Sequence, residues 1–170
     1  LPKNASKTYK VLVVLEDGTE KELVSAYNFD PIITKKDTEK FANGIHYEAY
    51  KILGAHPMEV NDIKGVHFAV WAPNVMRVSV VGDFNDWDVT GCPMTKLDNG
   101  VFELFLEGTD TLRDGMKVMA VIHSGGRELD RIPLYIHRVL QDPSDYSWNG
   151  VIYDPDEQFV WTDRNFKPKK

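Results

Sequence analysis

The sequence is short of three features that would point to common classes of protein. Its single cysteine, Cys92, cannot form an internal disulfide. The longest uninterrupted apolar run is VLVVL at 11–15, far below the roughly 20 residues that a membrane-spanning helix needs. The basic residues are scattered, apart from the terminal KPKK, and the formal net charge is -6. There is therefore no concentrated positive field of the kind that phosphate backbones favour.

These absences set the first expectations about partners and location. We expect no membrane span, no nucleic-acid partner and, from the N-terminal residues, no signal peptide. An unpaired cysteine favours a reducing cytoplasm, because oxidising compartments favour paired cysteines. Cysteine and histidine residues nowhere cluster at metal-ligand spacing, so we expect neither a bound metal nor another cofactor.

The composition is that of a folded protein. Hydrophobic residues make up 42% of the chain, charged residues 27% and aromatic residues 11%, which predicts a packed core rather than a disordered chain. A length of 170 residues suits one domain of about 100 to 150 residues with an appendage, or two small domains.

Residues 1–45 predict a β-hairpin followed by a short helix. Two strand-like runs flank Asp17-Gly18, a dipeptide that readily takes the positive φ angles of a tight turn. From residue 34 to 43, Thr34 is suited to cap a helix, Asp37 adds a partial capping box, and Gly44 would end it. Residues 46–64 predict a connecting segment that contributes another helical turn or two.

From residue 65 onward the sequence changes to short runs of alternating polar and apolar residues, separated by Gly, Pro, Asn or Asp. This texture is typical of antiparallel strands. The fold class it predicts is all-β: an immunoglobulin-like antiparallel β-sandwich over 65–155, with 156–170 as a linker. The residues expected to share one face of their strand are, in turn, Val66, Phe68 and Val70, then Met76, Val78 and Val80, and then Phe102, Leu104 and Leu106.

The stretch DFNDWD at 83–88 is the most unusual in composition. Asp83, Asp86 and Asp88 could supply the carboxylate pair of a glycoside hydrolase, but residues this close at a strand-to-loop junction diverge, and Asp is common in turns. Alternate oxygen ligands also suggest a calcium loop, yet Leu97 stands where its bidentate Glu is required. We therefore interpret the carboxylates as turn residues.

Trp87 leaves two interpretations open. A sugar ring has an apolar face and a rim of hydroxyl groups, so proteins bind it with an aromatic ring beneath and polar side chains at the edge. Trp87 and its polar neighbours supply both components. Alternatively, the indole folds back to cover the end of the core, since Trp is usually mostly buried.

Two motifs resemble one known family. YKILGAHP at 50–57 and GVHFAVWAPNVMRVSVVGDFNDWD at 65–88 are similar to the start of carbohydrate-binding module family 48, found before the catalytic barrel of glycogen and starch branching enzymes. The resemblance implies that Trp87 stacks on a glucose while Asn85 and Lys117 contact hydroxyl groups. The chain departs from the pattern at Met116, which replaces an aromatic residue, and after the Gly125-Gly126 turn, where no Trp follows.

The same resemblance implies a role without chemistry of its own. The segment would be a catalytically inactive N-terminal part of a 1,4-alpha-glucan branching enzyme, holding alpha-glucan for an absent catalytic barrel that follows it. Trp148, Phe159 and Trp161 would pack on that barrel, whereas we expect Tyr153 to complete the sandwich core. For Trp161, completing the core is an equally open alternative. The alternative is a purely structural module that buttresses the barrel without binding sugar.

Overall fold

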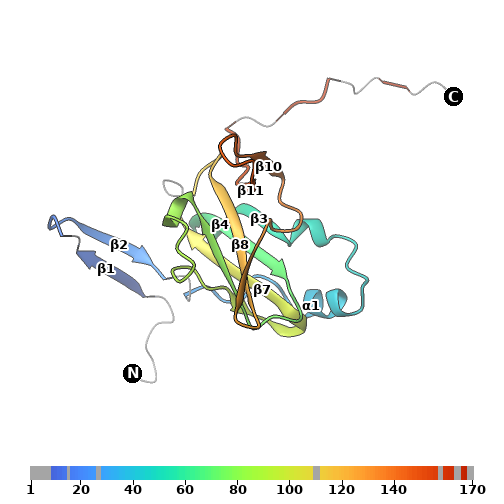
Figure 1. Cartoon of the computed structure of the whole chain (residues 1–170), viewed down its shortest axis with the longest axis horizontal. Coiled ribbons are helices and arrows are strands. Elements are labelled where there is room, and N and C mark those ends of the chain that lie inside the picture. The colour runs from blue at the N-terminus through green and yellow to red at the C-terminus, as the bar shows by residue number, and fades with distance from the viewer. Residues whose placement is uncertain are drawn as a thin grey trace.

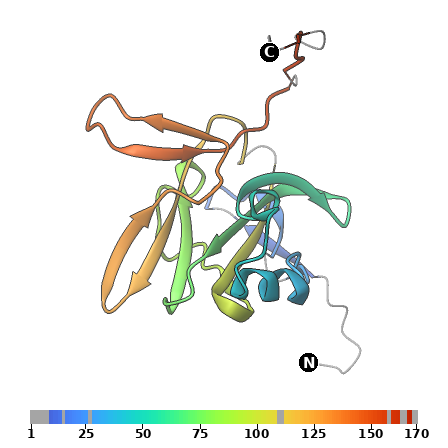
Figure 2. The same cartoon turned by 90° about the vertical axis from the view of Figure 1, so that its right-hand side faces the viewer.

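The computed structural model describes residues 9–14, 16–25, 28–108, 112–156, 159–162 and 166–167. Its main body is a sandwich of two antiparallel sheets, preceded along the chain by a hairpin and a helix (Figures 1 and 2). The predicted all-β, immunoglobulin-like class with an N-terminal hairpin and helix is therefore confirmed.

Each sheet combines strands that lie far apart in the sequence. The first sheet has the order β10 (Arg138–Gln141), β11 (Trp148–Val151), β8 (Lys117–Ser124), β5 (Arg77–Gly82), with β9 (Arg127–Arg131) also pairing with β8. The second sheet has the order β3 (Gly54–Val60), β4 (Ile63–Trp71), β7 (Val101–Glu107), β6 (Thr95–Lys96). The connections between the described strands include the single helical turns η2 (Ala49–Lys51), η3 (Asp83–Asn85) and η4 (Asp98–Gly100).

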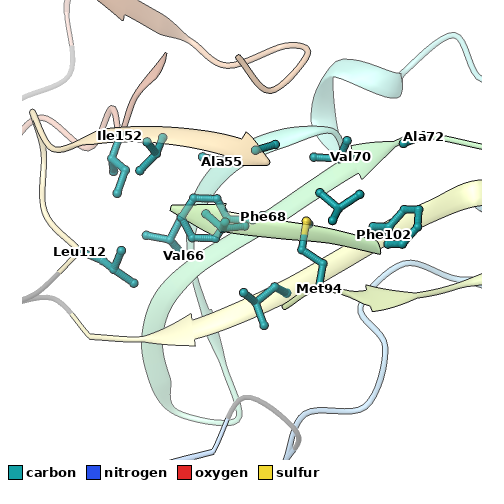
Figure 3. Packing of buried hydrophobic residues seen from close by; sticks show 14 residues of the cluster. Ala55, Val66, Phe68, Val70, Ala72, Met94, Phe102, Leu112 and Ile152 are labelled. Atoms are coloured by element: carbon teal, nitrogen blue, oxygen red, sulfur yellow. The ribbon is translucent and has the colours of Figure 1, made fainter. Parts of the chain in front are cut away.

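The core between the sheets follows the predicted alternation (Figure 3). Successive side chains of a strand point to opposite faces, so the inward set of each strand meets that of the other sheet. The buried members include Val66, Phe68 and Val70 of β4, Phe102 and Leu104 of β7, Val78 and Val80 of β5, and Val118 and Ala120 of β8. The predicted alternation was wrong at Met76, which precedes β5 and is 84% exposed.

The segment that we expected to be a connection contains an edge strand. All seven residues of β3 pair with β4, from Gly54 opposite Ala69 to Val60 opposite Ile63. Asn61 and Asp62 both have positive φ angles, of 52° and 63°, as a two-residue hairpin turn requires. Pro57 obscured this strand in the sequence, because proline is tolerated at a sheet edge but not in a central strand.

A helix and its flanking segments cover the outer face of the second sheet. Helix α1 (Lys35–Ala42) begins where predicted, because the Thr34 hydroxyl accepts a hydrogen bond from the Asp37 amide at 3.3 Å. It ends at Ala42, and Gly44, two residues later, has a φ angle of 67°. A second apolar cluster joins this layer to the sheet, made of Ile33, Phe41, Leu53, Ala69 and Val101.

One buried carboxylate fixes this layer to the sheet. Glu103 of β7 accepts hydrogen bonds from the backbone amides of Ile32 and Ile33 at 3.2 and 3.0 Å. Its Oε2 also lies 3.2 Å from Nε2 of His67, which is 2% exposed. Buried polar groups are costly unless they are bonded, and here the carboxylate and the segment before α1 satisfy each other.

The N-terminal hairpin stands apart from the sandwich (Figure 1). Strands β1 (Lys10–Val14) and β2 (Glu20–Val24) pair antiparallel around the predicted Asp17-Gly18 turn, in which Gly18 has a φ angle of 82°. No helix in the described ranges is both long and apolar enough to cross a bilayer.

We predict that Glu103→Ala lowers the free energy of unfolding by about 3 kcal/mol, because it leaves two backbone amides and a buried imidazole without their acceptor. Urea denaturation followed by circular dichroism measures this change. Glu59→Ala, which removes an exposed glutamate from β3 of the same sheet, is the matched control and should stay within about 0.5 kcal/mol of wild type. Equal effects of the two substitutions would show that Glu103 does not fix the helical layer to the sheet.

Candidate functional site

The candidate site lies where β5 ends beside the start of β8. Gly82 of β5 pairs with Val118, and Lys117 pairs on its other side with Val151 of β11. A β-carbon on Gly82 would lie 2.2 Å from the Lys117 carbonyl oxygen, so only glycine permits this approach of the strands. The loop of residues 83–91 therefore leaves the sheet directly beside Lys117.

Asn85 shapes the loop from within. Its Oδ1 accepts from the Gly82 amide at 2.9 Å, while its Nδ2 donates to the Val80 and Asp88 carbonyl oxygens at 3.3 and 3.1 Å. Both side-chain donor hydrogens are thus engaged. Its predicted contact with a sugar hydroxyl stays a prediction, and only the remaining lone pair of Oδ1 is available for it.

The sequence left undecided whether Trp87 covers the end of the core or stays accessible. In the structure these two roles belong to different rings, Phe84 and Trp87. Phe84 packs against the core, with its ring 6.3 Å from that of Phe68 in a stacked arrangement. Trp87 is 38% exposed and lies outside the core clusters of the described residues. The core-covering ring is therefore Phe84, and the indole keeps an accessible surface.

The polar edge of the indole is held by Asp83. The indole Nε1 donates to Asp83 Oδ1 at 3.3 Å, and the backbone amide of Lys117 donates to Asp83 Oδ2 at 2.8 Å. This carboxylate joins Trp87 to β8. The sequence predicted only a turn role for Asp83, because nothing in the local pattern shows which distant strand lies beside it.

Lys117 lies at the site, but its ammonium group already has a partner. Its Nζ is 2.5 Å from Oδ2 of Asp142, and Oδ1 of Asp142 accepts from the amide and hydroxyl of Ser144 at 2.9 and 2.6 Å. The hydrogen bond from Lys117, followed by those from Ser144, lowers the pKa of Asp142, and the same ion pair raises the pKa of Lys117. Asp142 comes from 25 residues farther along the chain, so sequence analysis missed it.

The structure does not support the two alternatives for the loop carboxylates, a glycoside-hydrolase pair and a calcium loop. Asp83 bonds Trp87 and Lys117, and Asp88 accepts from the amide and hydroxyl of Thr90 at 2.9 and 2.7 Å. Within the described ranges no three His, Cys, Asp or Glu side chains could together hold a metal ion. A cavity of about 590 Å³ is lined by other residues, among them Pro57 and Lys64, and does not include Trp87.

The residues predicted to pack on a barrel lie outside the loop that carries Trp87. Trp148 is 53% exposed on β11, whereas Phe159 and Trp161 are each 69% exposed in the segment that follows. The last two pack edge to face with centroids 5.0 Å apart. Tyr153 was expected in the core, which was wrong: it is 42% exposed, because Ile152 is the residue that points inward.

Known proteins resemble the chain in sequence and fold. Residues 52–136 match the family model described as carbohydrate-binding module 48 (isoamylase N-terminal domain). The 1,4-alpha-glucan branching enzyme GlgB of Rubrobacter xylanophilus is 46% identical over 107 residues, which are 63% of this chain and 15% of that enzyme. The GlgB of Picrophilus torridus is 32% identical over 169 residues, 96% of this chain and 22% of that enzyme. The chain thus spans less than a quarter of either relative.

A solved structure shows the same fold at lower sequence identity. Pullulanase type I from Bacillus subtilis, complexed with maltose, is 21% identical and aligns with a TM-score of 0.50, covering 91% of this chain and 18% of that one. At this identity the likeness concerns the arrangement of strands and carries no information on ligands.

We predict that Asp142 titrates below the usual range of aspartate and that Lys117→Met raises its pKa toward that range. Some lowering should remain, because Ser144 still donates two hydrogen bonds. Since the folded-state pKa is lowered, the pair stabilises the fold above the ordinary aspartate pKa, and this contribution disappears as the pH falls through the lowered value. Carboxyl-carbon NMR measures the midpoint. Lys117→Arg, which keeps the charge, should preserve most of the lowering, and an unmoved midpoint in Lys117→Met would refute the pairing.

Proposed function

Because the chain belongs to the carbohydrate-binding module 48 family, we propose that it binds alpha-glucan at the exposed indole of Trp87. The observation that carries this proposal is the division between two neighbouring rings: Phe84 packs on the core, while Trp87 remains 38% exposed at the end of the sandwich. An amphipathic ring with an open face and a bonded polar edge suits the apolar face of a pyranose.

The wider role we propose is that of a non-catalytic N-terminal segment of a 1,4-alpha-glucan branching enzyme in glycogen biosynthesis, acting in the cytoplasm. The relatives named as branching enzymes are several times longer than this chain. A module that holds glucan beside a catalytic barrel raises the local concentration of chains there, which helps even when the single contact is weak. The free thiol of Cys92 is compatible with a reducing compartment.

Lys117 keeps a role in the proposed site, but as one member of an ion pair and not as a free cation. Its ammonium is paired with Asp142, so a sugar hydroxyl would contact an ion pair rather than a free cation. The pair offers a donor on Lys117 and acceptors on Asp142, which matches the mixed hydrogen-bonding character of a hydroxyl group.

A specific observation also favours the structural alternative. Met116 stands where the family places an aromatic residue, and Arg127 follows the Gly125-Gly126 turn where a second stacking ring is expected. With one ring in place of several, the module could act chiefly as a buttress. The two roles differ in whether Trp87 responds to sugar.

We predict that Trp87→Ala weakens binding of maltoheptaose at least about tenfold, since it removes the apolar surface on which a pyranose would stack. Isothermal titration calorimetry measures the dissociation constant, and retardation in glycogen-containing native gels gives a second readout. Trp161→Ala is the matched control, because this ring is exposed in the C-terminal segment. An unchanged dissociation constant in Trp87→Ala would show that Trp87 is not the glucan site. If the wild type does not bind maltoheptaose, the purely structural role is favoured.

For the C-terminal rings we propose that Trp148, Phe159 and Trp161 pack on a catalytic barrel that follows in the parent protein. Their exposed fractions, 53, 69 and 69%, leave apolar surface that a neighbouring domain would bury favourably.

We predict that acrylamide quenches Trp161 efficiently in the 170-residue chain and several-fold less in a longer protein that carries the barrel, because packing excludes the quencher. Comparison with Trp161→Phe in each length isolates the contribution of this indole. Equal quenching in both lengths would contradict the packing role.

A further inference from the structure

The carboxylate of Asp83 occupies an unusual position between the indole and the sheet. One oxygen accepts from Trp87 Nε1 at 3.3 Å and the other from the Lys117 backbone amide at 2.8 Å. Since the second donor belongs to a strand, it anchors the carboxylate to the sheet. The first oxygen is thereby held at a defined place beside the indole.

The other polar residues of the loop hold its backbone and not the ring. Asn85 bonds the Gly82 amide and two carbonyl groups, and Asp88 bonds Thr90. Asp86 makes no side-chain hydrogen bond to the described residues. Within the described part of the chain, Asp83 is thus the hydrogen-bond partner of the indole nitrogen.

Packing alone does not enclose the indole, because Trp87 remains 38% exposed. Trp87 follows Asp86 in a left-handed backbone conformation, with φ angles of 60° and 50°, which bulky residues adopt only when their surroundings impose it. A ring free to rotate would lose conformational entropy when a ligand fixes it, whereas a ring already held would not.

We infer that Asp83 is a positioning residue for the proposed glucan site: it orients the Trp87 ring by bridging its Nε1 to the backbone of β8. This inference rests on the proposed function, and it adds that affinity depends on a side chain that touches no sugar. The bridge requires two acceptors on one group, which an ionised carboxylate supplies and an amide does not.

Asp83→Asn tests the bridge with almost no change in shape. Its amide has one acceptor and one donor, so one of the two N–H groups must face another donor. We expect the dissociation constant for maltoheptaose, measured by calorimetry, to rise on the order of tenfold, as loss of a charge-assisted hydrogen bond entails. Asp86→Asn removes the same charge from the same loop at a residue whose left-handed conformation asparagine tolerates, and should bind as wild type does.

The affinity is compared with the free energy of unfolding of each variant. A merely structural carboxylate would lower stability and leave the affinity of the folded protein unchanged. If Asp83→Asn binds maltoheptaose as tightly as wild type, or if Asp86→Asn weakens binding equally, the positioning role is overturned.

A second measurement needs neither sugar nor a folded variant at position 83. In the wild type, the indole ¹⁵N–¹H signal of Trp87, assigned through Trp87→Phe, should be shifted downfield and exchange with solvent several-fold more slowly than that of exposed Trp161. Equally rapid exchange would show that Asp83 does not hold the ring. If the indole is held but the wild type binds no maltoheptaose, the proposed glucan site fails, and the positioning role fails with it.

Discussion

The close approach of β5 and β8 at Gly82 is the constraint on which the candidate site depends. No β-carbon fits between Gly82 and the Lys117 carbonyl oxygen, and this contact brings the next residue, Asp83, within 2.8 Å of the Lys117 amide. From there the chain turns through η3, Phe84 packs on the core and Trp87 emerges at the edge. The position of the indole thus depends on the backbone packing of β5 against β8, directly before the loop begins.

The second sheet explains why the sandwich can carry such a loop. Its inner face packs on the first sheet and its outer face is covered by α1 and the segment before it, so β4 and β7 are buried on both sides. Glu103 and His67 sit in this outer interface and are hydrogen-bonded there rather than exposed. The candidate site lies on β5 and β8 of the first sheet, which packs on this doubly buried sheet. A site built at the end of packed strands keeps its geometry better than one built on a long loop.

Sequence patterns predicted the features that are local, such as strand alternation and helix capping. They missed the side-chain contacts between residues that lie far apart along the chain. The alternation of Val66, Phe68 and Val70 and the cap at Thr34 are local, and both were confirmed. By contrast, the roles of Phe84 and Trp87 cannot be separated by composition, since both are aromatic residues in one polar loop. Asp142 was missed for the same reason: its partner lies on another strand.

Errors at single positions have a related cause. Met76 continues the period of β5 by one step, yet the strand begins at Arg77, because alternation does not mark where pairing stops. Tyr153 and Ile152 are adjacent apolar residues, and only the register of β11 with β8 decides which one points inward. Register is set by pairing across the sheet, which is information that a single strand does not contain.

The bonding at the site bears on how strongly it could hold a neutral polymer. The side-chain donors of Asn85 are hydrogen-bonded within the loop and its flanking strand. Lys117 is paired with Asp142, and Asp83 accepts hydrogen bonds from the indole and from β8. A glucan would therefore gain chiefly the burial of one ring face, without displacing these bonds. Such contacts are individually weak and need little reorganisation, so long chains could slide across the ring and be released. In a protein with several glucan contacts, modest affinity at each one is compensated by their linkage in a single chain.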